Sequence, residues 1–267
     1  MIALTHAWGF SHEPFASDIP LKHLYPLPGL DSFLQRFAYA VAHNLTTVVT
    51  GEVGSGKSTS LRAAAGTLHP AQYRPLSIIA TSGSLLELLR QICFQLGDPP
   101  SSNSVAKTMC LIRGVLGDIT AKKQVPVLLV DEAHLLRLDV FAQLHTLTQM
   151  DYDARTLMPV ILSGQTSLID KLLFHPSRPF ASRVVGRSHM EALQRDHMAG
   201  YLKHHLSIVG GSTELFGEDA VTAILQSSGG LLRRAGNLAR GALLAAAQEH
   251  CPTVTAEHVR IAVTEIL

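Results

Sequence analysis

The sequence predicts an α/β protein in which helices cover both faces of a parallel sheet, with an all-helical domain after it. Short apolar, β-branched runs alternate with helical segments as far as residue 190, which is typical of a parallel sheet. One of these runs leads through a glycine-rich loop directly into a helix. From residue 191 onward, helical segments follow one another without clear strands. We therefore expect an N-terminal arm at 1–30, a core at 31–190 and a helical domain at 191–267.

The first fifty residues lead up to the glycine-rich loop. Residues 1–30 hold several Pro, His and aromatic side chains and are predicted to form an extended arm that covers the adenine side of a nucleotide site. Residues 31–43 place apolar side chains at helical spacing, and Asp31 is expected to cap that helix. Residues 45–50 are short, apolar and β-branched, as in a buried strand.

The loop after this strand carries the clearest motif of the chain. It reads G-x-x-x-x-G-K-S, the phosphate-binding pattern of nucleotide triphosphatases, and an Ala- and Leu-rich helix follows over 59–68. Loop N–H groups and the helix N-terminus would face the phosphates of ATP. The residues expected to contact the nucleotide are Gly51, Glu52, Val53, Gly54, Ser55, Gly56, Lys57, Ser58 and Thr59.

Four of these positions have individual expected roles. Gly51 and Gly56 are expected to adopt backbone angles that a side chain would forbid. Lys57 would place a cation against the β- and γ-phosphates, and the Ser58 hydroxyl would bind Mg²⁺.

A second apolar strand ends in two acidic residues. Between the two motifs, a strand at 76–80 and helices at 84–96 and 103–120 are expected. Residues 126–130 then form a buried-strand run that ends in Asp131 and Glu132. Opposite a phosphate-binding loop, Asp131 would hold Mg²⁺ through its water shell, and Glu132 would act as general base for the attacking water.

A third apolar run, at 158–162, also ends in polar residues, Ser163 and Gln165. Either side chain could sense the γ-phosphate from a position between the two motifs, and the sequence does not choose between them. A helix at about 139–150 precedes this run and a helix at 166–174 follows it.

Arginines follow the third strand and open a later helix. Arg178, Arg183 and Arg187 lie beyond the strand, where one could enter the site of a neighbouring subunit as an arginine finger. Arg233 and Arg234 open a helix of the second domain, from which an arginine could reach the γ-phosphate. The helices of that domain are expected at 194–209, 217–227, 231–250 and 255–267.

Composition excludes several other classes of protein. Charged residues make up 16% of the chain and the net charge is +1, so there is no strong overall field for nucleic acid or anionic lipid. Three isolated cysteines argue against a disulfide framework and indicate a reducing, cytoplasmic location. We find no signal peptide and no apolar run long enough to cross a membrane. The 14 histidines lack the spacing of helical metal sites.

Taken together, the motifs resemble one family. Gly-Glu-Val-Gly-Ser-Gly-Lys-Ser, Val-Asp-Glu-Ala-His-Leu-Leu, Leu-Ser-Gly-Gln and Gly-Gly-Leu-Leu-Arg-Arg occur in the order seen in AAA+ ATPases similar to ExeA, general secretion pathway protein A. The opening Trp-Gly-Phe-Ser-His-Glu-Pro-Phe and the segment Tyr-Leu-Lys-His-His-Leu also look like that family. The resemblance implies a P-loop AAA+ core with a C-terminal helical lid, and it implies ATP and Mg²⁺ as cofactors.

The resemblance also assigns residues. Lys57 and Ser58 take the phosphate and Mg²⁺ roles, Asp131 and Glu132 the Walker B roles, and Ser163 or Gln165 falls at sensor 1. Arg183 matches the finger position best. Arg233 matches sensor 2, but the family commonly has Pro where this chain has Leu232, so Arg234 remains an alternative.

The resemblance implies three competing functions. Stand-alone members, similar to MuB, TnsC and TniB, are ATP-dependent regulators of transposition that form rings or filaments; their partners are double-stranded DNA, a transposase and a target-selection adaptor. Because the sequence has neither a membrane segment nor a peptidoglycan-binding region after residue 267, we favour this branch. Lys122, Lys123, Arg113 and Arg74 are candidate contacts to DNA phosphates. The alternatives are a secretion-assembly ATPase and a nucleotide-exchange switch, and Glu132 argues against the switch.

Overall fold

The computed structural model of the protein describes residues 4–100, 102–150 and 154–265. The chain divides into two units. The sheet unit comprises Gly29–Gly51 and Lys57–Met190, and the helical unit comprises Met1–Pro28, Glu52–Gly56 and Glu191–Leu267. The start of the predicted arm, at 1–3, and the end of the predicted last helix, at 266–267, lie outside the described residues.

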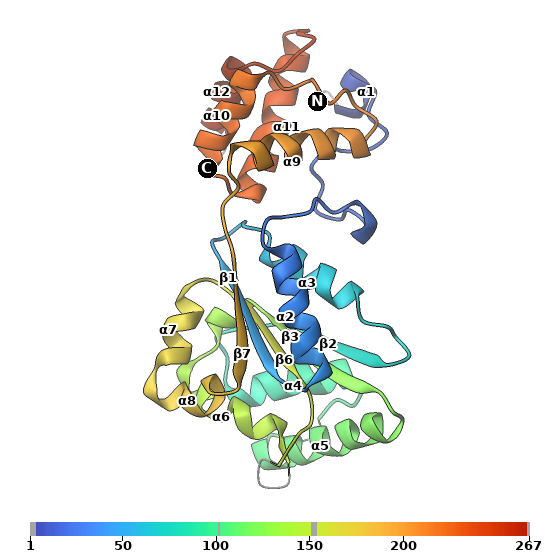
Figure 1. Ribbon diagram of the computed structural model, residues 1–267, viewed down its shortest axis with the longest axis vertical. Helices are drawn as coiled ribbons and strands as arrows, with labels where there is room; N and C mark the ends of the chain where they lie inside the picture. The colour runs from blue at the N-terminus through green and yellow to red at the C-terminus, as the bar shows by residue number, and fades with distance from the viewer. Residues whose placement is uncertain (1–3, 101, 151–153, 266–267) are drawn as a thin grey trace. The chain divides into compact units, whose positions relative to one another are not determined.

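The sheet unit is built on five parallel strands in the order β2-β3-β6-β1-β7 (Figure 1). β6 therefore lies between β1 and β3, although it comes later in the chain than both. Since all the strands are parallel, their carboxyl ends meet at one edge, which we call the carboxyl edge. The strands are β1 Thr46–Gly51, β2 Tyr73–Ile79, β3 Val125–Asp131, β6 Val160–Gly164 and β7 Val184–Met190.

Helices cover both faces of this sheet. Alternate residues of β3 point to opposite faces: Val127 and Leu129 pack with α2 and α3, whereas Leu128 and Val130 pack with α4 to α8. Both faces are buried, which explains why the central strands are rich in apolar and β-branched residues. This confirms the predicted α/β class. The helices are α2 Leu30–Ala42, α3 Lys57–Gly66, α4 Leu85–Leu96, α5 Val105–Ala121, α6 Leu138–Thr148, α7 Ser167–Leu173 and α8 Arg178–Ala181, with 3-10 turns η2 Ala133–Leu135 and η4 His175–Ser177.

Two parts of the sheet unit differ from the sequence prediction. The edge strand β7 was not predicted, because exposed polar residues such as Arg187 and His189 alternate with buried ones and leave no apolar run. The helix expected at 139–150 ends at Thr148, where the chain enters a short antiparallel hairpin of β4 Gln149–Met150 and β5 Arg155–Thr156.

Asp31 does not cap α2 as predicted. The N-cap residue is Gly29, whose φ of 80° is in the left-handed region, so that Asp31 lies within the first helical turn. A carboxylate there still favours the helix through its dipole. The helix expected at 84–96 is α4, whose N-cap residue is Ser84 and whose C-cap residue, Gly97, is left-handed.

The helical unit packs around α11. Its alanines, among them Ala239, Ala242 and Ala246, are fully buried and allow α10 and α12 to approach closely. The bridge between Phe216 and Val254 joins the segments before α10 and α12. The elements are α1 Leu4–Trp8, η1 Leu21–His23, α9 Arg195–Ile208, α10 Glu218–Ser228, α11 Leu232–Gln248 and α12 Ala256–Glu265 (Figure 1). Within the described ranges, every helix is too short or too polar to cross a bilayer.

We predicted that the N-terminal segment is an extended arm, but it is not extended throughout. It contains α1, and it is tied to the helices of its own unit. The Trp8 indole donates to the carbonyl of Leu243 (3.1 Å), and Ser11 N–H donates to the carbonyl of Val209 (2.9 Å). Contacts of its aromatic side chains therefore fix the path of this segment, whereas its Pro and His content had suggested an extended chain.

An aromatic cluster holds the segment in place. The buried Phe15 stacks on His205 (centroids 5.0 Å apart), and His205 also contacts the Tyr201 ring at 4.4 Å. Burial, together with the smaller effect of the neighbouring His204, lowers the pKa of His205 to about 4. The folded protein therefore holds His205 neutral.

This burial predicts a pH-dependent stability. An unfolded histidine takes up a proton below pH about 6.5, whereas His205 in the folded state does so only near pH 4. The contribution of His205 is therefore complete above pH ~6.5 and falls as the pH drops towards 4, by up to about 3 kcal/mol. Denaturant unfolding at pH 7.5 and 5.0 measures it. His205→Phe keeps the ring and should lose less stability between these pH values than the wild type; equal losses would contradict the assignment.

Candidate functional site

The carboxyl edge gathers the motif residues that the sequence analysis identified. β1 ends at Gly51, where the glycine-rich loop begins, and α3 starts at Lys57, where the loop ends. β3 ends at Asp131 and the neighbouring β6 at Gly164. In open α/β sheets, ligands bind outside the carboxyl ends of the strands. The strand order therefore makes this edge the candidate site.

The glycine-rich loop has the backbone of a tight turn, with a positive φ at Gly54 (83°) and Gly56 (95°). Gly51 ends β1 without a positive φ, so the expectation that Gly51 needs a forbidden angle is wrong; Gly54 takes that role. Lys57 opens α3 and is only 6% exposed.

The buried hydroxyl of Ser55 fits a phosphate ligand. Ser55 is 3% exposed, and its Oγ has no hydrogen-bond partner among the described residues. An unpaired buried hydroxyl costs about 1–3 kcal/mol, and a phosphate oxygen would remove that cost. Together with the cation of Lys57 at a helix N-terminus, this supports a loop shaped for an anion.

Asp131 is oriented by two hydrogen bonds to one of its oxygens. Ser163 Oγ donates to Asp131 Oδ1 (2.8 Å), and the Glu132 N–H donates to the same oxygen (2.9 Å). Both bonds use Oδ1, so Oδ2 is the oxygen better placed to accept from a water or bind a cation. Ser163 is fully buried and is occupied by this contact, whereas the backbone N–H of Gln165 points to the His134 ring.

The turn after β3 fixes the position of Glu132. Glu132 adopts a left-handed conformation (φ 53°), which directs the chain into η2. Its carboxylate lies 3.3 Å from His134 Nδ1. His134 received no role in the sequence analysis. Its position two residues after Glu132 is the feature of the sequence that could have predicted this contact.

Residues of α7 and β6 pack against this turn and hold it in place. Lys171 Nζ donates to the carbonyls of His134 and Leu136 (2.8 Å to the latter), and burial lowers the pKa of its amine. A Cβ at Gly164 would lie 3.0 Å from the backbone N of His134 and 3.2 Å from Leu168 Cδ2. Only a glycine at the end of β6 allows η2 to approach this closely.

In the helical unit, the loop segment Glu52–Gly56 contacts the start of α11. Arg233 N–H donates to the carbonyl of Gly54 (3.3 Å), and a Cβ on Gly54 would lie 3.1 Å from Arg233 Cβ. A Cβ on Gly56 would collide with Leu27 and Leu232 (2.6 and 2.9 Å). Of the two arginines that open this helix, Arg233 is therefore the one beside the loop.

Comparison with known proteins agrees with this geometry. Residues 41–172, from the end of α2 to α7, match the family model of the AAA domain. The chain carries an AAA+ ATPase domain. Residues of the ATPase core and the helices after it are also 31% identical, over 245 residues, to general secretion pathway protein A of Aeromonas hydrophila, which confirms the resemblance to ExeA-like ATPases. That match covers 91% of this chain but 44% of the relative, so the chain spans less than half the length of that protein.

Solved structures show the same fold at low sequence identity. Cdc6p of Pyrobaculum aerophilum superimposes with a TM-score of 0.74 at 17% identity, covering 95% of this ATPase and 70% of that chain. The ORC1 protein of Aeropyrum pernix, solved in complex with DNA, gives a TM-score of 0.65 at 16% identity over 94% of this chain and 68% of that one.

The finger candidates of the ATPase do not lie at the carboxyl edge. Arg183 precedes β7, its carbonyl accepts from Thr46 N–H at the amino end of β1, and its guanidinium donates to the Pro179 carbonyl. Arg178 is exposed at the start of α8, and Arg187 is exposed within β7. Within the sheet unit these arginines are not brought to Asp131 and Glu132.

The candidate DNA contacts are scattered. Arg74 donates to the carbonyl of Leu96 (2.9 Å) and Arg113 to that of Thr146 (2.7 Å), so both guanidinium groups bind the protein itself. Lys122 and Lys123 are exposed after α5. No single basic surface follows from these four residues.

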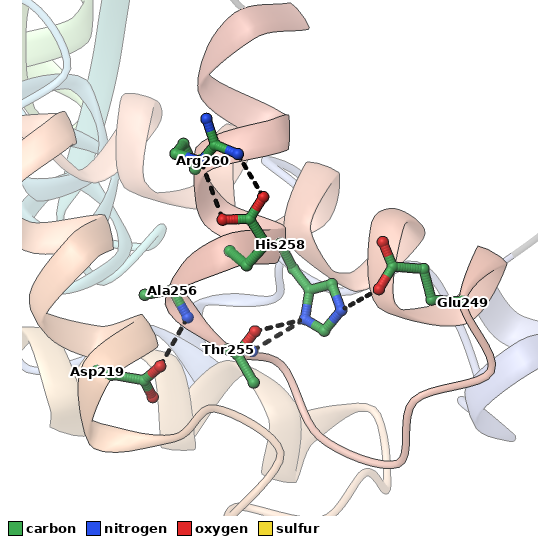
Figure 2. Close-up of polar contacts among 7 residues, drawn as sticks. Asp219, Glu249, Thr255, Ala256, His258 and Arg260 are labelled. Carbon is green, nitrogen blue, oxygen red and sulfur yellow. Dashed lines mark hydrogen bonds and ion pairs between the residues drawn. The ribbon is translucent and has the colours of Figure 1, made fainter.

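One cluster with metal-ligating side chains lies in the helical unit. Atoms of Glu249, Cys251 and His258 come within 4.8 Å of one another. Figure 2 shows what the histidine does: Nδ1 accepts from Thr255 N–H (3.0 Å), and Nε2 faces Glu249 Oε2 (3.1 Å). Because Nδ1 accepts a hydrogen bond, the neutral ring carries its proton on Nε2, which then donates to Glu249 and cannot also bind a metal. The buried His258 thus caps α12, in the manner of a capping box.

This role predicts the behaviour of a His258 variant. His258→Ala should lower the free energy of unfolding by about 1–3 kcal/mol, because the N-cap amide of Thr255 and the carboxylate of Glu249 both lose their partner. Thermal unfolding with Zn²⁺ or with EDTA checks the alternative. Both additions should leave the melting temperature of the wild type unchanged, and a zinc-dependent rise that Cys251→Ser abolishes would identify a metal site instead.

Proposed function

We propose that this protein binds and hydrolyses ATP at the carboxyl edge, with Glu132 as general base. The observation that carries the proposal is the end of β3: Asp131 is held by Ser163 and the Glu132 amide, while Glu132 itself is 41% exposed and reachable by water. The Ser55 hydroxyl and Lys57 support phosphate binding by the loop. Gly51, Glu52, Val53, Gly54, Gly56 and Thr59 complete the proposed nucleotide contacts.

The oxygen atoms of the Ser58 hydroxyl and the Asp131 carboxylate are suitable ligands for Mg²⁺. Ser58 is exposed at the first turn of α3, and the Oδ2 atom of Asp131 is available at the same edge. We assign these two residues to the metal, Ser58 directly and Asp131 through water. When bound, the ion would neutralise charge that develops on the phosphates.

The remaining site residues receive roles by their contacts. Ser163 orients Asp131, which leaves Gln165 as the better sensor of the γ-phosphate at the end of β6. Arg233, beside Gly54, is favoured over Arg234 as sensor 2. Arg183 lies away from the carboxyl edge of its own sheet, so as a finger it would act in the site of a neighbouring subunit in a homo-oligomer.

We further propose that the protein is an ATP-dependent regulator of transposition. In this role it would bind double-stranded DNA and act on a transposase and a target-selection adaptor. The AAA+ core and the resemblance of its motifs to MuB-, TnsC- and TniB-like ATPases support it, as does the similar fold of an ORC1 protein solved with DNA. The second candidate is the ATPase module of a secretion-assembly system, favoured by the identity to general secretion pathway protein A.

Two substitutions separate ATP binding from hydrolysis. Glu132→Gln removes the base but keeps the size of the side chain, so hydrolysis should fall by about 100-fold or more while ATP still binds. Lys57→Ala removes the buried cation and should weaken ATP binding by about 10- to 100-fold. Phosphate release and fluorescent-nucleotide titration measure the two effects. Normal turnover by the Glu132→Gln protein would refute the assigned base and favour an exchange switch.

Binding to random-sequence duplex DNA distinguishes the transposition proposal from the secretion-assembly proposal. The transposition proposal predicts binding that requires ATP and Mg²⁺, is strongest in the Glu132→Gln protein, and weakens steeply with salt because phosphate contacts release counterions. Fluorescence anisotropy across a salt series, with sizing of the complexes, is the measurement. Absence of binding in every nucleotide state would favour the secretion-assembly proposal and leave the ATPase assignment standing.

A further inference from the structure

The ring of His134 lies between the proposed general base and the end of the neighbouring strand. Its Nδ1 atom is 3.3 Å from Glu132 Oε2 and 3.4 Å from the backbone N of Gln165. Glu132 follows β3 and Gln165 follows β6, so one nitrogen faces the ends of two adjacent strands.

The two partners require opposite states of this nitrogen. The Gln165 amide is a donor and needs Nδ1 without a proton, whereas the Glu132 carboxylate is an acceptor and needs Nδ1 with a proton. A neutral imidazole meets one demand at a time, with its single proton on Nδ1 or on Nε2. A bare Nδ1 at 3.3 Å from a carboxylate oxygen repels it, so contact with Gln165 disfavours contact with Glu132.

The ring is held firmly enough to serve as a reference point. The side chain of His134 is 12% exposed, compared with 41% for Glu132. Lys171 binds the backbone carbonyl of His134, and Gly164 packs closely against its backbone N, so the chain that carries the ring is well anchored. The carboxylate of Glu132 is therefore the partner with freedom to move, although its backbone is fixed by the hydrogen bond to Asp131.

We propose that His134 is a positioning residue that shares Nδ1 between the Glu132 carboxylate and the Gln165 amide, so that the general base is oriented according to the position of the end of β6. With the ring proton on Nδ1, His134 donates to Glu132 and aims it. When the Gln165 amide binds Nδ1, the proton resides on Nε2 and Glu132 is released. The proposal rests on the proposed ATP hydrolysis and adds how its base is controlled.

Steady-state kinetics of the protein tests the orienting role. His134→Ala should lower kcat for ATP by about 10-fold and leave the affinity for ATP within about twofold, because the ring touches the base and not the loop. His134→Asn, whose amide can meet one partner at a time, should recover part of the loss. His175→Ala, which removes an exposed histidine of the same unit, is the matched control and should behave as wild type.

Background variants separate this inference from the assignment of the base. In Glu132→Gln protein, adding His134→Ala should produce no further loss, since the two residues act through one group. If Glu132→Gln abolishes turnover but His134→Ala turns over normally, the inference fails and the proposed function stands. If Glu132→Gln turns over normally, the proposed function itself fails.

Hydrogen exchange at the Gln165 amide tests the sharing directly, without ATP turnover. Removing the competitor in Glu132→Ala leaves Nδ1 to Gln165, so exchange of that amide should slow by about threefold or more, whereas His134→Ala should accelerate it. Both changes in the expected directions support a shared nitrogen. Unchanged exchange in both variants, or a fall in melting temperature that accounts for the kinetic loss of His134→Ala, would reduce His134 to a structural residue.

Discussion

The position of β6 between β1 and β3 is the constraint on which the candidate site depends. β6 pairs with both neighbours in parallel, so three strand ends that are far apart in sequence meet at one edge. The hydrogen bond from Ser163 to Asp131 continues this pairing beyond the backbone ladder. Sheet topology thereby brings the residues that flank the glycine-rich loop, Gly51 and Lys57, to the same edge of the sheet unit as the acidic pair and the polar end of β6.

Sequence patterns predicted most of the fold because the central strands are buried on both faces. β1, β3 and β6 are rich in β-branched and apolar residues, and such runs are recognised without knowledge of their partners. β7 was missed because it is an edge strand, where solvent tolerates Arg187 and His189. The N-terminal segment was misjudged because its structure comes from contacts between Trp8 or Phe15 and helices about 200 residues away, which no local pattern records.

The residues of the candidate site likewise divide into those predicted from local sequence motifs and those that depend on tertiary contacts. Lys57, Asp131 and Glu132 were identified from spacing and flanking strands alone, since these motifs are local. The choice between Ser163 and Gln165 needed the observed bond to Asp131, because both residues end the same strand. The involvement of His134 depends on a close approach of two chain segments at Gly164, and this is a property of tertiary packing. Arg183 shows the converse, as a plausible motif position that the topology places at the opposite edge.

The left-handed backbone of Glu132 sets stability and chemistry against each other. The Cβ of a residue in this conformation costs about 1 kcal/mol. Glycine avoids that cost, and asparagine offsets part of it because its short side chain can form local hydrogen bonds. The turn would thus be more stable without the carboxylate that we propose as general base, and under that proposal drift towards Gly or Asn at this position is opposed only while turnover is needed. A relative of this protein with Gly or Asn here would mark a lineage that kept the nucleotide as a structural ligand and gave up its consumption.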